Sequence, residues 1–262
     1  MHLGHIRLGR LPKTRKWRSV FEVLEMGNAD PAAVAVSVAV AAERDFADLH
    51  ATPGVVGDGL WVISLLGDFS RSAEARDALM HLGMQESSFS SPSRLISSLP
   101  TRAQLGEATA AGAVFDQMAD LSLKAAIGRH FSGGMLPLFG SSTDEVHDRC
   151  QELGSSPTYA QVARDFLGEF MSRVVRYAVD REASNFLGSS DAWSTAGDLL
   201  ALGDRLDTYC RDSSRIVQDF ADGWHSKAKY HTAEGVTREA SRRFAAHALT
   251  KLRMELEGCK DD

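Results

Sequence analysis

Residues 159–186 read YAQVARDFLGEFMSRVVRYAVDREASNF, and no other stretch indicates the fold class so clearly. Its large apolar side chains recur every three or four residues, which places them on one face of an α-helix. They are Tyr159, Val162, Phe166, Phe170, Val174 and Tyr177. A face of this kind is typical of a helix that packs in a protein core.

A second long helix is predicted from Asp191 to about Ala221. Its seam advances by steps of three and four through Ala196, Leu199, Gly203, Leu206, Cys210, Ser213, Val217 and Phe220. The spacing matches a coiled-coil heptad, but Gly203 and Ser213 interrupt the apolar seam. We therefore expect a helix within a bundle, with Gly223 as its stop.

Helix signals continue on both sides of these segments. Asp30-Pro31 is a strong helix start, because Asp accepts hydrogen bonds from free backbone N–H groups and Pro fits the first helical position. Further helices are predicted over residues 14–26, 31–50, 55–66, 72–83, 102–129 and 237–256, and from Ser142 onward. Because no clear alternating strand or βαβ pattern is visible, the sequence predicts an all-α bundle of about 8–10 helices, several of them about 20–30 residues long.

A serine-rich stretch gives the only candidate domain boundary. Residues 85–98 hold seven serines and one proline, with a short helical turn expected at Pro92, and they favour an exposed connection. It would separate an N-terminal helical subdomain, residues 19–86, from a C-terminal helical bundle, residues 99–262. One continuous domain fits the sequence equally well.

Charge is distributed unevenly along the chain. Residues 1–18, the basic arm, carry no acid and six bases, whereas residues 19–223 carry 15 basic and 29 acidic residues. The bases of the arm are Arg7, Arg10, Lys13, Arg15, Lys16 and Arg18, interleaved with Leu3, Ile6, Leu8, Leu11 and Trp17. An asymmetry of this kind concerns partners rather than the fold. We expect the arm to dock on protein: on the acidic body of the same chain, on a second copy or on another subunit. Nucleic acid is the alternative partner.

A second candidate binding segment reads DFADGWHSKAKY, residues 219–230. It combines Trp224, His225, Lys227, Lys229 and Tyr230. Aromatic side chains among lysines suit stacking on nucleic-acid bases or burial in a protein interface. The structural alternative is that Trp224 simply fills the bundle core.

Motifs that specify a reaction are missing from the sequence: it holds no phosphate-binding loop, dinucleotide fingerprint, zinc-protease helix, nucleophile elbow or calcium loop. Among the nine histidines, His225 with His231 and His2 with His5 are the closest pairs, and neither pair has a Cys or acid at metal-ligand spacing. No metal or other cofactor is therefore expected. One spacing is similar to the motif of HEPN ribonucleases. Arg76 with His81, Arg242 with His247, and Arg44 with His50 fit R-x(4–6)-H. The resemblance implies a histidine that acts on the RNA 2′-hydroxyl and an arginine that meets phosphate.

The cysteines and the apolar runs bear on the compartment. Cys150, Cys210 and Cys259 are scattered without a CxxC pair, which favours free thiols in a reducing environment. The longest apolar run, residues 32–42, is shorter than the ~20 residues that span a bilayer. We expect a cytoplasmic protein that does not enter a membrane.

These observations favour a non-enzymatic helical interaction or scaffold subunit of a multi-protein bacterial assembly, a phage-defence type system being one example. One alternative is a nucleic-acid-binding accessory protein that uses the basic arm and residues 224–230. Another is a HEPN-like ribonuclease that uses Arg242 and His247, or Arg76 and His81.

Overall fold

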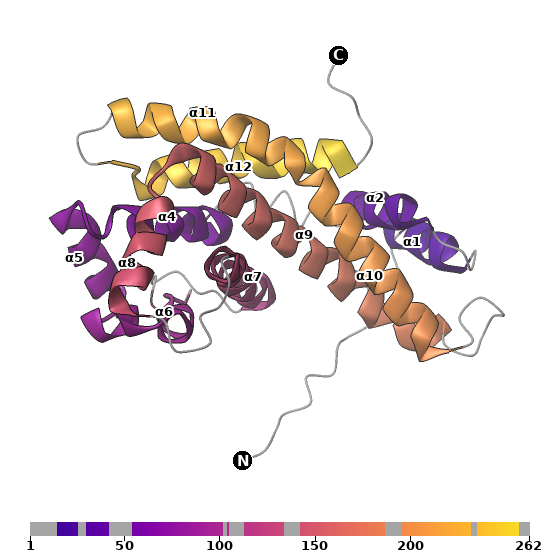
Figure 1. Cartoon of the computed structure of the whole chain (residues 1–262). Helices are drawn as coiled ribbons and strands as arrows, with labels where there is room; N and C mark the ends of the chain where they lie inside the picture. The colour runs from indigo at the N-terminus through magenta and orange to yellow at the C-terminus, as the bar shows by residue number, and fades with distance from the viewer. Residues whose placement is uncertain are drawn as a thin grey trace.

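The regular structure is helical throughout the residues that the computed structural model describes, which confirms the predicted all-α bundle (Figure 1). The described residues are 15–25, 30–41, 54–101, 104, 113–133, 142–186, 195–231 and 235–256. The elements are α1 (Arg15–Glu25), α2 (Pro31–Ala41), α4 (Gly54–Asp68), α5 (Ala73–His81), η1 (Glu86–Ser90), α6 (Pro92–Ser98), α7 (Ala113–Ser132), α8 (Thr143–Glu152), α9 (Ser156–Phe186), α10 (Ala196–Ser213), α11 (Arg215–His231) and α12 (Arg238–Leu256).

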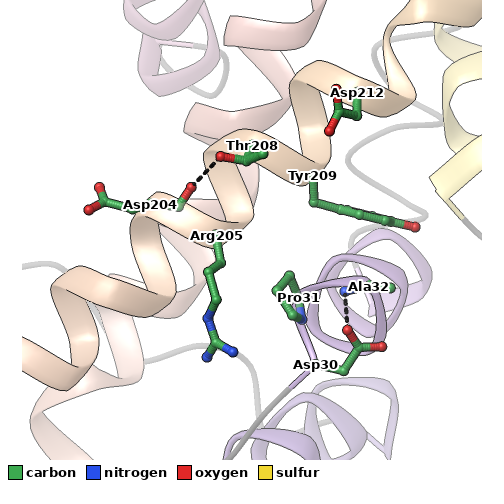
Figure 2. Close-up of a pocket in the computed structure, with 8 residues that line it drawn as sticks. All are labelled: Asp30, Pro31, Ala32, Asp204, Arg205, Thr208, Tyr209 and Asp212. Atoms are coloured by element: carbon green, nitrogen blue, oxygen red, sulfur yellow. Dashed lines mark hydrogen bonds between the residues drawn. The ribbon is translucent and has the colours of Figure 1, made fainter.

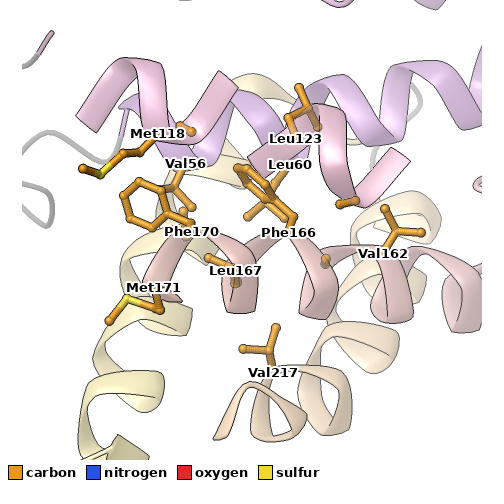
Figure 3. Close-up of a cluster of buried hydrophobic side chains, with 14 of the residues drawn as sticks. Val56, Leu60, Met118, Leu123, Val162, Phe166, Leu167, Phe170, Met171 and Val217 are labelled. Atoms are coloured by element: carbon orange, nitrogen blue, oxygen red, sulfur yellow. The ribbon is translucent and has the colours of Figure 1, made fainter. Parts of the chain in front are cut away.

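Helix α9 is the axis of the bundle and contacts α1, α2, α4, α7, α10 and α11 (Figure 1). The apolar stripe that predicted it faces inward along most of its length: Tyr159 and Phe166 are fully buried, and only Tyr177 is half-buried. Figure 3 shows Phe166 and Phe170 on the side of α9 that faces Val56 and Leu60 of α4. A central helix with apolar side chains on several faces lets separate neighbours bury their own stripes against it.

Helix α4 is buried on nearly all sides, and its glycines explain how it fits. A Cβ added at Gly57 would lie 2.5 Å from the Cα of Arg242 on α12, and one added at Gly59 would lie 2.6 Å from the ring of Phe166. Side chains at these two positions would therefore push the neighbouring helices away. The apolar run 55–66, interpreted from sequence as a buried helix, is confirmed as one.

The predicted single helix over residues 191–221 was wrong in two respects. The chain turns at Ser214, which separates α10 from α11, and α11 continues through Gly223 to His231. The turn lies where the chain crosses α9 closely: a Cβ at Gly168 would be 2.7 Å from Ser214 Oγ. A Cβ added at Gly223 would meet no atom within 4 Å outside its own helix backbone, and α11 continues past it, so Gly223 is a tolerated helical glycine rather than a stop.

The serine-rich stretch, predicted as an exposed connection with a turn at Pro92, is helical and only partly exposed. Its serines wind it into η1 and α6, with Ser91 Oγ accepting a hydrogen bond from Arg94 N at the start of α6. Phe89 and Leu95 are fully buried, and Phe89 stacks on Phe69 with ring centroids 3.8 Å apart. Both helices contact α7 or α8, and the buried apolar side chains of the described residues form one cluster from Trp17 to Leu256.

Other predicted helix starts are confirmed at the atomic level. Asp30 Oδ1 accepts a hydrogen bond from Ala32 N at 3.4 Å, and Ser142 Oγ accepts one from Glu145 N at 3.2 Å. The helix predicted over 72–83 is α5, with Ser72 as its cap. Within the helix predicted over 102–129, the described part is α7, which extends to Ser132.

Candidate functional site

A groove between α7, α9 and α10 is the concave surface best suited to receiving another molecule. Its volume is about 640 Å³. The lining residues are Val114, Gln117, Met118 and Leu121 of α7, Glu169, Ser172, Arg173, Arg176, Tyr177 and Asp180 of α9, and Asp207 of α10. Val114 is 38 % exposed and Leu121 is 43 % exposed, although both are apolar. They lie seven residues apart, which is two helical turns, so both belong to the same outer face of α7.

The charges on the α9 and α10 side of this groove are largely paired with one another. Glu169 accepts hydrogen bonds from Arg129 and, at 2.8 Å, from Arg173. Asp207 accepts one from Arg176 at 3.0 Å and another from Ser172. These acids of the groove wall are therefore paired within the molecule.

Asp180 is the exception among the groove acids. It is exposed and has no ion pair within the part of the chain that the structure describes. Partial burial of Asp180 raises the pKa of its carboxyl group, the charge of Arg176 lowers it, and the charge of Asp207 raises it. Among the described residues, this carboxylate is the groove acid without an ion pair, so a cation brought to this end of the groove could pair with it.

A second concavity, of about 490 Å³, lies where the start of α2 meets α10 (Figure 2). Three carboxylates line it, Asp30, Asp204 and Asp212, together with Arg205 and Tyr209. Figure 2 shows the Asp30 carboxylate turned back on its own helix, where it caps Ala32. The Tyr209 hydroxyl donates a hydrogen bond to the Leu256 carbonyl at 3.2 Å, so this polar group of the lining already has a partner within the protein.

A third cavity, of about 460 Å³, opens between the α4–α5 hairpin and the start of α12. Lys229 reaches into it and donates to Asp68 Oδ1 at 2.7 Å and to the Gly154 carbonyl at 3.0 Å. Arg238 lies over the ring of Trp61, with its guanidinium carbon 5.6 Å from the ring centroid. The cations here are already bound to protein acceptors.

The segment 224–230 is divided between the core and the surface. Trp224 stacks on Phe244 with ring centroids 4.2 Å apart, and Lys229 is tied to Asp68. Lys227 is exposed, and Tyr230 is 87 % exposed. The five residues therefore do not form one continuous platform.

His225 is a core residue. It is fully buried and stacks on Tyr159 with ring centroids 4.0 Å apart and the planes 11° from parallel. Its Nδ1 lies 3.0 Å from Ser156 Oγ, and its Nε2 is buried without a hydrogen-bond partner. Burial, aided by the charge of Lys229, lowers the pKa of His225 to about 3. The imidazole is therefore neutral at physiological pH.

The R-x(4–6)-H pairs do not converge in the described residues. Arg242 donates to Asp58 on α4 from Nε at 2.8 Å and from Nη2 at 3.1 Å, whereas His247 lies against Phe220 on α11, with ring centroids 5.3 Å apart. Positions five residues apart point about 140° away from each other around a helix, which explains the divergence.

The other described pair is also separated. Arg76 lies over the ring of Phe69, with 5.3 Å from its guanidinium carbon to the ring centroid. The Nδ1 of His81 lies 2.7 Å from the Asp77 carbonyl oxygen, one turn back on the same helix. The third pair, Arg44 with His50, lies outside the described residues.

Most of the basic arm falls outside the described residues, including Arg7, Arg10 and Lys13. The described chain begins at Arg15, the first residue of α1, and Arg15 and Lys16 belong to that helix. Trp17 is a buried core residue, and Arg18 is exposed.

Asp58 is the structurally important charged residue that the sequence reading missed. Its side chain is 0 % exposed and accepts four hydrogen bonds of 2.7–3.1 Å from Arg238 and Arg242. The signal was present in the sequence: one acid in an otherwise apolar, glycine-punctuated run needs a buried cationic partner. The groove left a signal too, because Val114 and Leu121 lie on the side of α7 opposite to the buried Ala119, Ser122 and Ala126.

No group of three or more His, Cys, Asp or Glu side chains in the described part of the chain is placed to hold a metal ion. No helix among the described residues has both the length and the hydropathy to cross a bilayer. Cys150 and Cys210 are free and buried, and burial raises the pKa of each thiol to about 12.

The chain matches no protein-family model, and neither a curated protein nor a solved structure shows significant similarity to it.

Proposed function

We propose that this protein is an interaction subunit of a multi-protein assembly and that the α7–α9–α10 groove receives an amphipathic segment of its partner. The observation that carries the proposal is the exposure of Val114 and Leu121 along one side of a groove whose opposite wall is polar. Helix-in-groove recognition uses such a surface, with apolar anchors spaced along the bound helix.

The charges favour a particular kind of bound segment. Because Glu169 and Asp207 are already paired, they hold the wall in place rather than attract a ligand. Asp180 is left to bind a cation. A partner segment with two apolar anchors about two turns apart, followed by a Lys or Arg, would satisfy both sides of the groove.

The placement of the candidate catalytic residues supports a binding role over a catalytic one. Arg242 is committed to Asp58 and His225 is buried and neutral. The chemistry that a ribonuclease needs would require a histidine and an arginine side by side on an accessible surface. Neither described R-x(4–6)-H pair offers that.

The experiment compares two exposed leucines. Leu121→Glu places a charge in the groove, and Leu200→Glu is the matched control, because Leu200 is 62 % exposed on α10 and does not line the groove. Tagged full-length protein is recovered from its native host, the captured protein is purified, and the dissociation constant is measured by calorimetry. We expect Leu121→Glu to weaken binding at least ten-fold and Leu200→Glu to leave it unchanged. Equal effects of the two substitutions, or recovery of a monomer with no partner, would refute the proposal.

Nucleic-acid binding is the second candidate, because Lys227 and Tyr230 lie three residues apart on one exposed face of α11. A cation beside an exposed ring suits a stacked base. Gel-shift titrations with single-stranded RNA and DNA at 50 mM and 300 mM salt test it. Binding that weakens steeply with salt and is lost in Tyr230→Ala supports this role, and no binding at 50 mM salt excludes it.

A further inference from the structure

We propose that residues 1–14 of the basic arm occupy the α7–α9–α10 groove of their own molecule and compete there with the partner. This inference rests on the proposed function of the groove. It assigns an internal ligand to that surface and makes access to it a regulated property.

The composition of the arm is complementary to the lining of the groove. The groove offers exposed apolar surface at Val114 and Leu121 and, at Asp180, a carboxylate with no ion pair to another described residue. Residues 1–14 contain no acid, and they alternate leucine or isoleucine with arginine and lysine. Leu8 and Leu11 can cover the α7 side while the base between them, Arg10, approaches Asp180.

The acidic lining of the second concavity does not compete strongly for the arm. Asp30 caps α2, and Asp212 pairs with Arg215 at 3.0 Å. That concavity also exposes no large aliphatic side chain, since its apolar lining is Pro31, Ala32 and the ring of Tyr209. Leucine side chains of the arm would therefore gain less there.

The arm joins the body beside one wall of the groove. It meets α1 at Arg15, and α1 contacts α9, which lines the groove. Leu11 and Leu8 stand four and seven residues before Arg15, so an extended chain carries them up to about 13 Å and about 23 Å from that residue, at about 3.3 Å per residue.

Tethering makes even a weak contact effective. A short tether gives an effective concentration on the order of 1 mM. An isolated arm that binds with a dissociation constant of about 0.1 mM would then occupy its own groove about 90 % of the time. A competing partner would bind about ten-fold more weakly than to an open groove, because only the open fraction is competent.

The test uses the full-length chain throughout. A fluorescent peptide with the sequence of residues 1–14 is titrated with the wild type and with Leu8→Glu/Leu11→Glu, which disables the tethered arm and leaves the helical body unaltered. Anisotropy should show about ten-fold tighter peptide binding to the variant, because its groove is open. Adding Leu121→Glu or Asp180→Asn to that variant should abolish or weaken binding, whereas Leu200→Glu should not.

Several results would overturn the inference. They are the absence of peptide binding to the arm variant, binding that Leu121→Glu does not reduce, and equal affinity for the wild type and the arm variant. A wild-type dimer in light scattering that the arm variant converts to monomer would place the arm in a second copy's groove instead. If a partner protein binds through Leu121 while the peptide does not bind, the proposed function stands and the arm inference fails.

Discussion

Replacing Asp58 by asparagine is the most informative single perturbation of the fold. Asp58 lies in the middle of the buried helix α4 and joins it to α12 through Arg238 and Arg242. Asparagine keeps the shape of the side chain and one carbonyl acceptor. Its amide group, however, would point N–H donors at guanidinium donors, and the negative charge that neutralises two arginines would be gone.

The magnitude follows from the burial of the three groups. Removing one partner of a buried ion pair costs about 3–5 kcal/mol. Asp58 is fully buried, but Arg238 and Arg242 are 31 % and 24 % exposed, so water can solvate them in the variant. We therefore expect a loss near the lower limit, about 3 kcal/mol. For a domain stable by about 5–15 kcal/mol, that is a large fraction of the total.

Urea denaturation followed by far-UV circular dichroism at pH 7 measures the effect. The matched control is Glu239→Gln, which removes the partner of Arg243 on the same helix, in a pair that is 78 % and 72 % exposed. The control should lose no more than about 0.5 kcal/mol. A loss below about 1 kcal/mol for Asp58→Asn, or a loss equal to that of the control, would show that the cluster is not what holds α4 to α12.

Wild type and Asp58→Asn should also differ in how their free energy of unfolding depends on pH. Burial raises the pKa of Asp58, but the hydrogen bonds and charges of Arg238 and Arg242 outweigh it and hold the pKa below its usual value. The stabilisation is therefore complete above the unfolded-state pKa of about 3.9 and is lost as the pH falls below it. The stability difference between wild type and Asp58→Asn should be constant above about pH 5 and should shrink as the pH falls below about 3.9 toward the lower native pKa.

Two further predictions concern the core. His225 has a native pKa of about 3 against about 6.5 when unfolded, so wild type should lose about 2 kcal/mol from this group between pH 7.5 and pH 5. Denaturation curves of His225→Phe should lack that part of the loss, and an unchanged pH dependence would contradict the assignment. Gly57→Ala should destabilise by about 1–3 kcal/mol through overpacking, whereas Gly223→Ala, with open space around it, should stabilise by up to about 1 kcal/mol through helix propensity. Thermal melts that rank the two alanines in the opposite order would refute the packing argument.

The helices themselves were predictable because their signals are local. The apolar stripe of residues 159–177 and the Asp30 cap depend only on neighbours within a few turns, and both are confirmed. The break at Ser214 was not predictable in this way. It depends on a close crossing with Gly168, which lies 46 residues earlier in the chain. The boundary between α10 and α11 therefore depends on a tertiary contact, which helix propensity alone does not predict.

In the candidate site, too, local sequence signals did not reveal contacts between distant parts of the chain. Sequence spacing paired Arg242 with His247, but the arginine is bound across the bundle by Asp58, and no pattern within one helix reveals such a partner. The groove likewise depends on a tertiary contact, because α7 packs beside α9 and α10, which come later in the chain. Only the position of Val114 and Leu121, opposite the buried side of α7, hinted that this helix has a second apolar face.

The basic residues after position 223 show why net charge alone does not locate a binding surface. Residues 224–262 hold eight bases against six acids, which suggests a positive face. Lys229 is nevertheless bound to Asp68, and Arg238 and Arg242 are bound to Asp58. These cations neutralise acids of α4, and their charge is internal to the fold. We therefore expect the salt dependence of any partner complex to follow substitutions in the basic arm rather than substitutions of Arg238 or Arg242 in α12.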